Sequence, residues 1–320
     1  MTDARIEAAA VASAEGAGDA APPRYSIFGG PLSGWAFVCV ALGLLAVFVI
    51  TPFVMSFGLS FTNQRLVQNP NIPVQWVGLR NYERLFTDPD FWNALGNTAT
   101  FAAIVVPVQS AVALGLAMLV NSSLPGANAF RVIFFLPVII TMTIICVIFG
   151  ALFIFPGGAL NALLGWITGG AFEPVDWLGS PGTAMASIIV LSIWASAGFQ
   201  MVIYLAGLQT IPEELYEAAR MDEASGWQQF WWITMPMLRP THVFVVTATT
   251  IFAFKLFTQV QILTQGGPRG ATDTLVRFIY VNGFSELRVG YASAATVVFM
   301  GIVLTIALIQ RFLIEERDDR

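Results

Sequence analysis

Few side chains in this 320-residue chain are suited to catalysis or metal binding. The single lysine, Lys255, follows Phe254, so the Gly-Lys-[Ser/Thr] signature of a nucleotide-binding P-loop is absent. The single histidine, His242, is not part of a Cys/His cluster with metal-site spacing. The Gly-x-Ser-x-Gly pattern of a nucleophile elbow is also absent. We therefore expect a protein that is not an enzyme and that has no catalytic or metal-binding residues.

Lys255 has polar neighbours at helical spacing. Thr258 and Gln259 follow it at i+3 and i+4, which would place all three on one helix face within a largely apolar segment. An ammonium group facing lipid costs about 2.5–3.5 kcal/mol on insertion scales. We therefore expect the three residues to face a water-filled path and to bind substrate hydroxyls or a phosphate. Snorkelling of Lys255 to the headgroups is the alternative. Phe252, one turn earlier on the same face, could bound the path, although we expect it to pack against a neighbouring helix.

The carboxylates gather elsewhere, in residues 210–240. This stretch is the longest polar interval between two long apolar runs and holds five of the chain's twenty carboxylates. Helix signals predict two short helices joined by a tight turn: capping boxes at Thr210–Glu213 and Ser225–Gln228, and a stop at Pro236. From the physics alone, an amphipathic hairpin lying on the membrane surface explains the stretch as well as a functional role does.

The elements that must position these residues are membrane helices. The chain is 56% hydrophobic and 11% charged, whereas soluble domains average about 25% charged residues. Its apolar runs are long and continuous, which favours helices over a barrel. We predict an all-α integral membrane protein with about six transmembrane helices, near residues 34–58, 97–120, 132–154, 183–207, 241–264 and 290–310.

The net charge and the cysteines limit the possible partners and cross-links of this membrane protein. The net charge of −5 argues against nucleic acid as a partner. Cys39 and Cys146 fall in apolar runs, so we expect buried thiols and no disulfide framework. Residues 1–30 are expected to form a disordered tail, residues 31–315 the transmembrane domain, and residues 316–320 a short end on the same side. Arginine counts on the two sides give only a weak positive-inside bias.

The polar stretch also has a distinctive order of residues: Glu217-Ala218-Ala219, Asp222, Ala224, Trp227-Gln228, Phe230 and Ile233-Thr234-Met235-Pro236. This order resembles the EAA loop of binding-protein-dependent ABC importer permeases, most closely in the sugar-importing branch of the maltose and glycerol-phosphate type. The strings at residues 78–82, 88–92 and 263–268 also look like sugar permease sequences. The similar stretches lie between Gly78 and Ala294, so the resemblance covers most of the chain.

The resemblance implies a type I ABC importer permease fold in a bacterial inner membrane, with both termini cytoplasmic. The permease would pair with a second permease subunit, two ATPase subunits and an extracytoplasmic solute-binding protein. ATP and Mg would be bound by the ATPase subunits, so no cofactor is expected in this chain. The transported substrate would be a sugar, polyol or sugar-phosphate.

In that family the EAA loop is cytoplasmic and docks into a cleft of the ATPase. The coupling residues implied here are Glu217, Ala218, Ala219, Asp222, Glu223 and Trp227, with Glu217 pairing with an ATPase arginine. The family has glycine at the position of Glu223. A left-handed turn there would cost a glutamate about 1–2 kcal/mol, so we expect the turn to be built differently.

Two other classes remain open. A cation-coupled secondary transporter would carry acidic residues or histidine inside the membrane when protons drive it, yet every carboxylate falls outside the predicted spans. A sodium site made of carbonyl groups is not excluded by that observation. A non-transporting membrane scaffold explains the hydrophobicity but not the EAA-like loop.

Overall fold

The computed structural model of the chain describes residues 31–68, 73–121 and 126–315. In these ranges the regular elements are helices, apart from one isolated β-bridge between Thr62 and Trp76. The chain divides after Met55 into two units, and each is described by itself. The predicted tail (residues 1–30) and C-terminal end (residues 316–320) lie outside the described residues.

The first unit contributes an apolar helix. It comprises α2 (Pro31–Leu45), the π-helical turn η1 (Ala46–Ile50) and the start of α3 (Thr51–Leu59). Residues Phe37–Leu59 are apolar and long enough to cross a membrane, as predicted. Cys39 on this helix is exposed, so the expectation of a buried thiol is wrong there, whereas Cys146 is buried.

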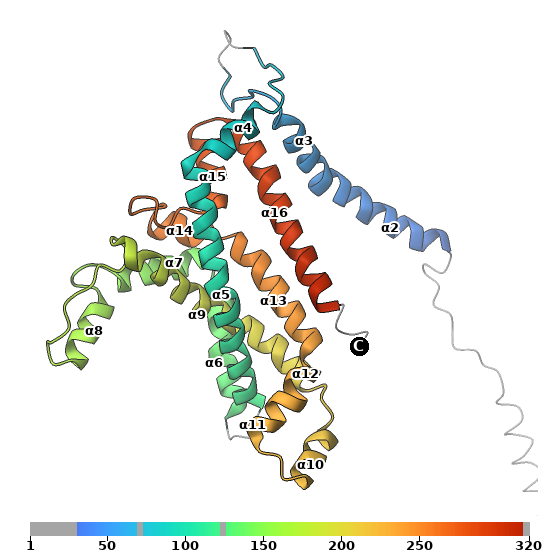
Figure 1. Cartoon of the computed structure of the whole chain (residues 1–320), viewed down its shortest axis with the longest axis vertical. Coiled ribbons are helices and arrows are strands. Elements are labelled where there is room, and N and C mark those ends of the chain that lie inside the picture. Colours follow the sequence, from blue (N-terminus) through green and yellow to red (C-terminus); the bar gives the residue numbers. More distant parts are fainter. Residues whose placement is uncertain (1–30, 69–72, 122–125, 316–320) are drawn as a thin grey trace, which may run out of the picture. The chain divides into compact units, whose positions relative to one another are not determined.

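The second unit contains the remaining candidate spans (Figure 1). Three agree closely with the sequence prediction: α5 (Pro89–Asn121), α9 (Pro181–Leu208) and α16 (Val289–Glu315). Asp88 caps α5, because its Oδ1 accepts the Asp90 N–H at 2.9 Å, and Pro89 takes the first helical position. Together with the first unit, the described residues contain five candidate spans, or six if one bent helix pair is counted.

The predicted third span is not one continuous helix. It consists of α6 (Ala127–Ile139) and α7 (Met142–Leu152), which are bent by 96°. Ile140 and Thr141 have extended ψ angles of 132° and 134° and separate the two helices. The Ile140 N–H bonds the Pro137 carbonyl at 3.2 Å, which closes the end of α6 with a tight turn.

The fifth span is broken as well, at the residues predicted to form its polar face. It runs as α13 (Arg239–Phe254) and α14 (Thr258–Leu263), with Lys255 at the C-terminal cap of α13. Phe257 leaves the helical region with φ −142°. The Leu256 carbonyl is satisfied from outside the helix, since the Thr274 hydroxyl donates to it at 2.9 Å. The i+3 and i+4 helical spacing assumed for Lys255 therefore does not apply.

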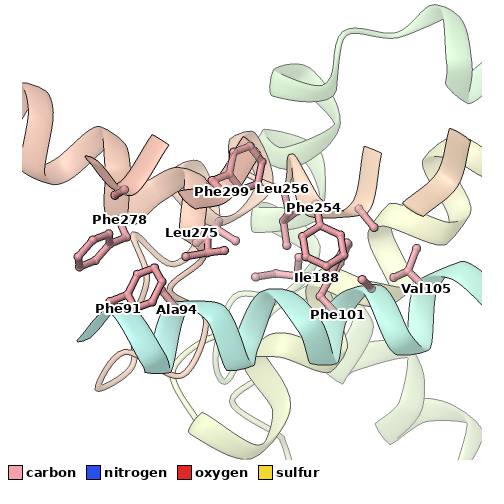
Figure 2. Packing of buried hydrophobic residues seen from close by; sticks show 14 of the residues in the cluster. Phe91, Ala94, Phe101, Val105, Ile188, Phe254, Leu256, Leu275, Phe278 and Phe299 are labelled. Carbon is pink, nitrogen blue, oxygen red and sulfur yellow. The ribbon is translucent and has the colours of Figure 1, made fainter. Parts of the chain in front are cut away.

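A hydrophobic core joins the spans of the second unit. It is formed where α5, α9, α13 and α16 meet α15 (Leu275–Tyr280). Figure 2 shows its buried side chains, among them Phe91, Phe101, Ile188, Phe254, Leu275, Phe278 and Phe299. A second cluster packs α5 and α9 against the start of α13 around Met201, Tyr204 and Val245. These two clusters fix the helices that surround the candidate site.

Short elements lie beyond the ends of the spans (Figure 1). α4 (Arg80–Thr87), α8 (Ala159–Ile167) and η3 (Val281–Ser285) belong to loops between spans. α8 lies in the loop between Pro156 and Pro181. Between α9 and α13 lie α10 (Glu213–Met221), α11 (Gly226–Gln229), η2 (Phe230–Thr234) and α12 (Met235–Met237).

Candidate functional site

A cavity of about 460 Å³ lies between the spans of the second unit. Its walls come from α5, the α6–α7 bend, α9, α13 and α14. Apolar side chains such as Phe101, Val105 and Leu256 form part of the lining and also belong to the core of Figure 2. The polar lining consists of Gln109, Ser192, Ser196, Gln200, Thr249, Lys255 and Gln259. The volume is within the range of small-molecule binding sites.

Three polar residues of the lining come from one face of α9. Ser192, Ser196 and Gln200 are four residues apart, so they lie above one another along the helix. Gln200 is 5% exposed and donates through Nε2 to Thr249 Oγ1 on α13. Its Oε1 is buried without a hydrogen-bond partner. An unpartnered buried acceptor is costly, and here it belongs to a side chain of the cavity wall.

Sequence reasoning missed this α9 face. The signal is present, because a polar residue recurs every fourth position from Ser192 through Tyr204 in an otherwise apolar span. Tyr204 continues the stripe beyond the cavity and its hydroxyl is 2.7 Å from His242 Nδ1. His242 thus joins α13 to α9.

The structure brings two of the three predicted path residues to the cavity. Lys255 and Gln259 line it, whereas Thr258 is not among the lining residues. The Gln259 Nε2 donates to Ser192 Oγ at 3.4 Å, which links α14 to α9. Phe252 also lines the cavity and is 65% exposed, so it bounds the cavity instead of being buried against a neighbouring helix.

Lys255 is the one charged residue of the lining. Its side chain is exposed, and the ion pairs within the described ranges do not include it. They are Arg277–Asp273 and Arg288–Glu286, both on the segments that follow α14. The cavity therefore combines neutral hydrogen-bonding groups with one cation and no carboxylate.

The predicted coupling residues lie on the α10–α11 hairpin. Most of them are exposed (Glu217, Ala218, Asp222, Glu223 and Trp227), and Ala219 is partly buried. Tyr216 OH and Thr234 Oγ1 lie 2.9 Å apart and join α10 to η2. The hairpin thus presents its acidic and aromatic side chains outward while its inner face is held to the helix that leads into α13.

The capping predictions have mixed outcomes. Ser225 and Gln228 form the predicted capping box at the start of α11. The prediction for Thr210 is wrong, because its hydroxyl donates to the Gly207 carbonyl at the end of α9 and α10 begins only at Glu213. The stop at Pro236 is also wrong. The π-helical turn η2 precedes it and the helix continues to Met237.

The turn between α10 and α11 is left-handed at Glu223, with φ 56°. The Ala224 N–H bonds the Ala219 carbonyl at 2.9 Å and the Glu223 N–H bonds the Arg220 carbonyl at 3.1 Å, which closes the end of α10. The expectation that glutamate requires a differently built turn is therefore wrong. Glu223 adopts the conformation that suits glycine and bears its cost.

Comparisons with known proteins agree with this architecture. The family described as "Binding-protein-dependent transport system inner membrane component" matches residues 111–317. The chain is 34% identical to the lactose transport system permease protein LacF of Rhizobium radiobacter, over 89% of this chain and 95% of LacF. It is 30% identical to the trehalose/maltose transport system permease protein MalF of Thermococcus litoralis, over 86% of this chain and 91% of MalF.

Solved structures are similar as well. A chain of a bacterial ABC transporter involved in the import of the acidic polysaccharide alginate superposes with a TM-score of 0.76. The match has 25% sequence identity and covers 88% of this chain and 94% of the other. The fold of the chain is thus comparable to that of a solved transporter over most of its length.

Proposed function

The chain belongs to the family of inner membrane components of binding-protein-dependent transport systems, and we propose that its cavity is the carbohydrate path of an ATP-driven importer. It is a membrane-spanning permease subunit of the sugar ABC importer type. Relatives are named for lactose and for trehalose or maltose, and a structural neighbour for alginate. The observation that carries the proposal is a polar-lined cavity in an otherwise apolar bundle.

The lining suits carbohydrate. The amide and hydroxyl groups of Gln109, Ser196 and Gln200 can exchange hydrogen bonds with sugar hydroxyls. The rings of Phe199 and Phe252, which are 48% and 65% exposed, can cover the apolar face of a sugar ring. A path must bind its substrate weakly enough to release it, and dispersed neutral groups meet that requirement.

The partners are part of the proposal. The chain would pair with a second permease, two ATPase subunits and an extracytoplasmic solute-binding protein in a bacterial inner membrane, with both termini cytoplasmic. ATP and Mg would be bound by the ATPase subunits and no cofactor by this chain. The family description, which names binding-protein-dependent transport, supports a delivered substrate.

We also propose that the α10–α11 hairpin couples the permease to the ATPase. Glu217 and its neighbours Ala218, Ala219, Asp222, Glu223 and Trp227 carry the order of the EAA loop, and five of these six residues are exposed. Trp227 is 70% exposed and Trp232 is 81% exposed, which leaves aromatic surface available to a partner. The exposed carboxylates would meet cations in the ATPase cleft.

Reconstitution tests the proposal. The permease is placed in liposomes alone, with its second permease and ATPase, and with these plus the binding protein. We expect uptake of a radiolabelled sugar mixture only in the complete assembly with ATP. Uptake by the permease alone that follows a proton or sodium gradient would instead indicate a secondary transporter. Absence of uptake from an intact, ATP-hydrolysing assembly would indicate a scaffold.

A further inference from the structure

We propose that the cavity selects carbohydrates that carry a negative charge and that Lys255 recognises this charge. The inference rests on the proposed import function and specifies its substrate class. It follows from three properties of the cavity: the sign of its charge, the position of its cation, and the neutral groups around that cation.

The first property is the charge of the lining. Lys255 is the chain's single lysine, and it is the one charged side chain among the residues that line the cavity. The other lining residues include neither aspartate nor glutamate. In the described part of the chain no carboxylate lies within ion-pair distance of its ammonium group. A low-dielectric wall strengthens the field of such a charge relative to bulk water.

The second property is the position of Lys255 at the end of α13. It occupies the C-terminal cap, where its backbone N–H bonds the Phe252 carbonyl at 3.1 Å. A helix C-terminus carries about half a negative charge, so it stabilises a nearby cation but neutralises only part of it. A net positive charge therefore remains for a ligand. The break after Lys255 also separates it from Thr258, which does not line the cavity.

The third property is the neutral polar surface around Lys255. The Gln200 side chain is only 5% exposed, and its Oε1 has no hydrogen-bond partner. Its side chain lines the cavity, so the amide contributes a neutral polar group to the wall, while its Oε1 lies buried behind the lining surface. Ser196 and Gln109 add further neutral hydrogen-bonding groups. Acceptors for hydroxyls together with one cation describe a polyhydroxylated anion better than a neutral sugar.

A carboxylate, a phosphate or a sulfonate would meet the same cation, since each is an anionic oxygen acceptor. A flexible ammonium accepts all three as a point charge, whereas arginine would favour bidentate geometry. The cavity therefore selects for a negative charge on the carbohydrate. The test below uses a carboxylate and a phosphate ligand to identify which anionic group carries that charge.

The first test measures the electrostatic potential in the cavity. The starting protein is the assembled transporter with Cys39→Ala, Cys146→Ala and Ser196→Cys. The thiol introduced by Ser196→Cys is modified with an anionic and with a cationic methanethiosulfonate reagent in each nucleotide state. The ratio of the two rates cancels differences in access. We expect Lys255→Met to lower the anionic-to-cationic ratio about tenfold.

Two control variants accompany this measurement. Lys255→Arg keeps the charge and should leave the ratio unchanged. Arg65→Met removes an equal charge from an exposed loop residue outside the cavity and should also leave it unchanged. A ratio that is the same in Lys255→Met and in the starting protein overturns the proposal. A thiol that reacts with neither reagent in any state contradicts the water-filled cavity itself.

The second test measures ligand protection with size-matched pairs. The probes are galacturonate disaccharide against galactose disaccharide, and trehalose 6-phosphate against trehalose. Protection of the Ser196→Cys thiol from a neutral methanethiosulfonate reagent is recorded. We expect one or both anions to protect at about tenfold lower concentration than their neutral partners, a preference lost in Lys255→Met and kept in Lys255→Arg.

The possible outcomes distinguish the selection of charged substrates from carbohydrate import itself. Protection by the carboxylate alone, the phosphate alone or both identifies the source of the charge and supports the proposal. Equal protection within each pair, or protection by the neutral sugars only, overturns the charge selection while leaving carbohydrate import intact. Absence of protection by all four probes overturns the selection as well, and the reconstituted uptake assay then decides separately whether sugar import stands.

Discussion

The Gln200 side chain on α9 donates a hydrogen bond to the Thr249 hydroxyl on α13, across the wall of the cavity. Thr249 Oγ1 in turn donates to the Val245 carbonyl of its own helix at 2.6 Å. Both side chains are buried, at 5% and 3% exposed. The pair therefore ties two spans together beside the candidate path and orients the free Gln200 oxygen.

Thr249→Val should loosen this connection. It removes the acceptor of Gln200 without a large change of volume. Hydrogen bonds between membrane helices are worth about 0.6 kcal/mol on average and at most about 1.7 kcal/mol, so we expect a thermal unfolding midpoint a few degrees lower. Thr305→Val is the control, because Thr305 is exposed and bonds only its own helix. Equal midpoints for the two variants would contradict a role for the pair.

Gly198 permits close contact between α9 and α6. A Cβ at this position would overlap the Phe134 carbonyl. Gly198→Ala should therefore destabilise the bundle by about 1–3 kcal/mol, as overpacking does. Gly301→Ala is matched to it, since Gly301 also lies within a helix but a Cβ there meets nothing within 4 Å. Thermal unfolding of the purified proteins checks the difference. A Gly198→Ala protein as stable as Gly301→Ala would disprove the close approach.

Glu223 stores strain in the hairpin turn. With φ 56° it sits in the left-handed region, so Glu223→Gly should relieve about 1 kcal/mol and strengthen or preserve ATPase docking. Glu223→Ala removes the carboxylate but keeps the Cβ, which isolates the effect of charge. Co-purification with the ATPase is the measurement. If both variants lose the ATPase equally, the carboxylate contacts the partner and strain is the minor factor.

Glu217→Lys should uncouple ATP hydrolysis from transport. The residue is exposed on α10, where its carboxylate is free to meet a cation of the ATPase. Charge reversal would place like charges together, and we expect substrate-stimulated ATPase activity to fall about tenfold or more while membrane insertion is unchanged. Glu214→Lys reverses a charge on the same helix outside the EAA order and serves as the control. Normal stimulated activity in Glu217→Lys would refute the assignment.

The positions of the spans could be predicted because each is a long apolar run, and burial in lipid dominates over local detail. The breaks within them could not. Pro137 favours a kink in the third span, but the break itself falls at Ile140 and Thr141, and the break in the fifth span falls at Phe257. The Leu256 carbonyl is satisfied by Thr274 from a distant segment. Such breaks depend on tertiary partners, which the local sequence does not contain.

In the candidate site, too, local interactions could be predicted from the sequence and tertiary contacts could not. The Ser225–Gln228 capping box is a local interaction and was predicted, whereas the Thr210 hydroxyl bonds the preceding helix instead of its own. Lys255 and Gln259 were expected on one helix face and reach the same cavity by a helix break. The α9 residues Ser192, Ser196 and Gln200 become recognisable as a wall only when the helices are packed together.

The central claim is that substrate crosses the membrane through this cavity, and blocking the cavity tests it directly. In the complete reconstituted importer, Ser196→Cys with Cys39→Ala and Cys146→Ala is alkylated with a bulky, membrane-impermeant maleimide, and ATP-dependent uptake is measured. Ser285→Cys, at an exposed residue outside the cavity, is the control. We predict that complete alkylation abolishes uptake in Ser196→Cys, that substrate slows the alkylation, and that the control transports normally. Unchanged uptake by fully alkylated Ser196→Cys protein would contradict the account.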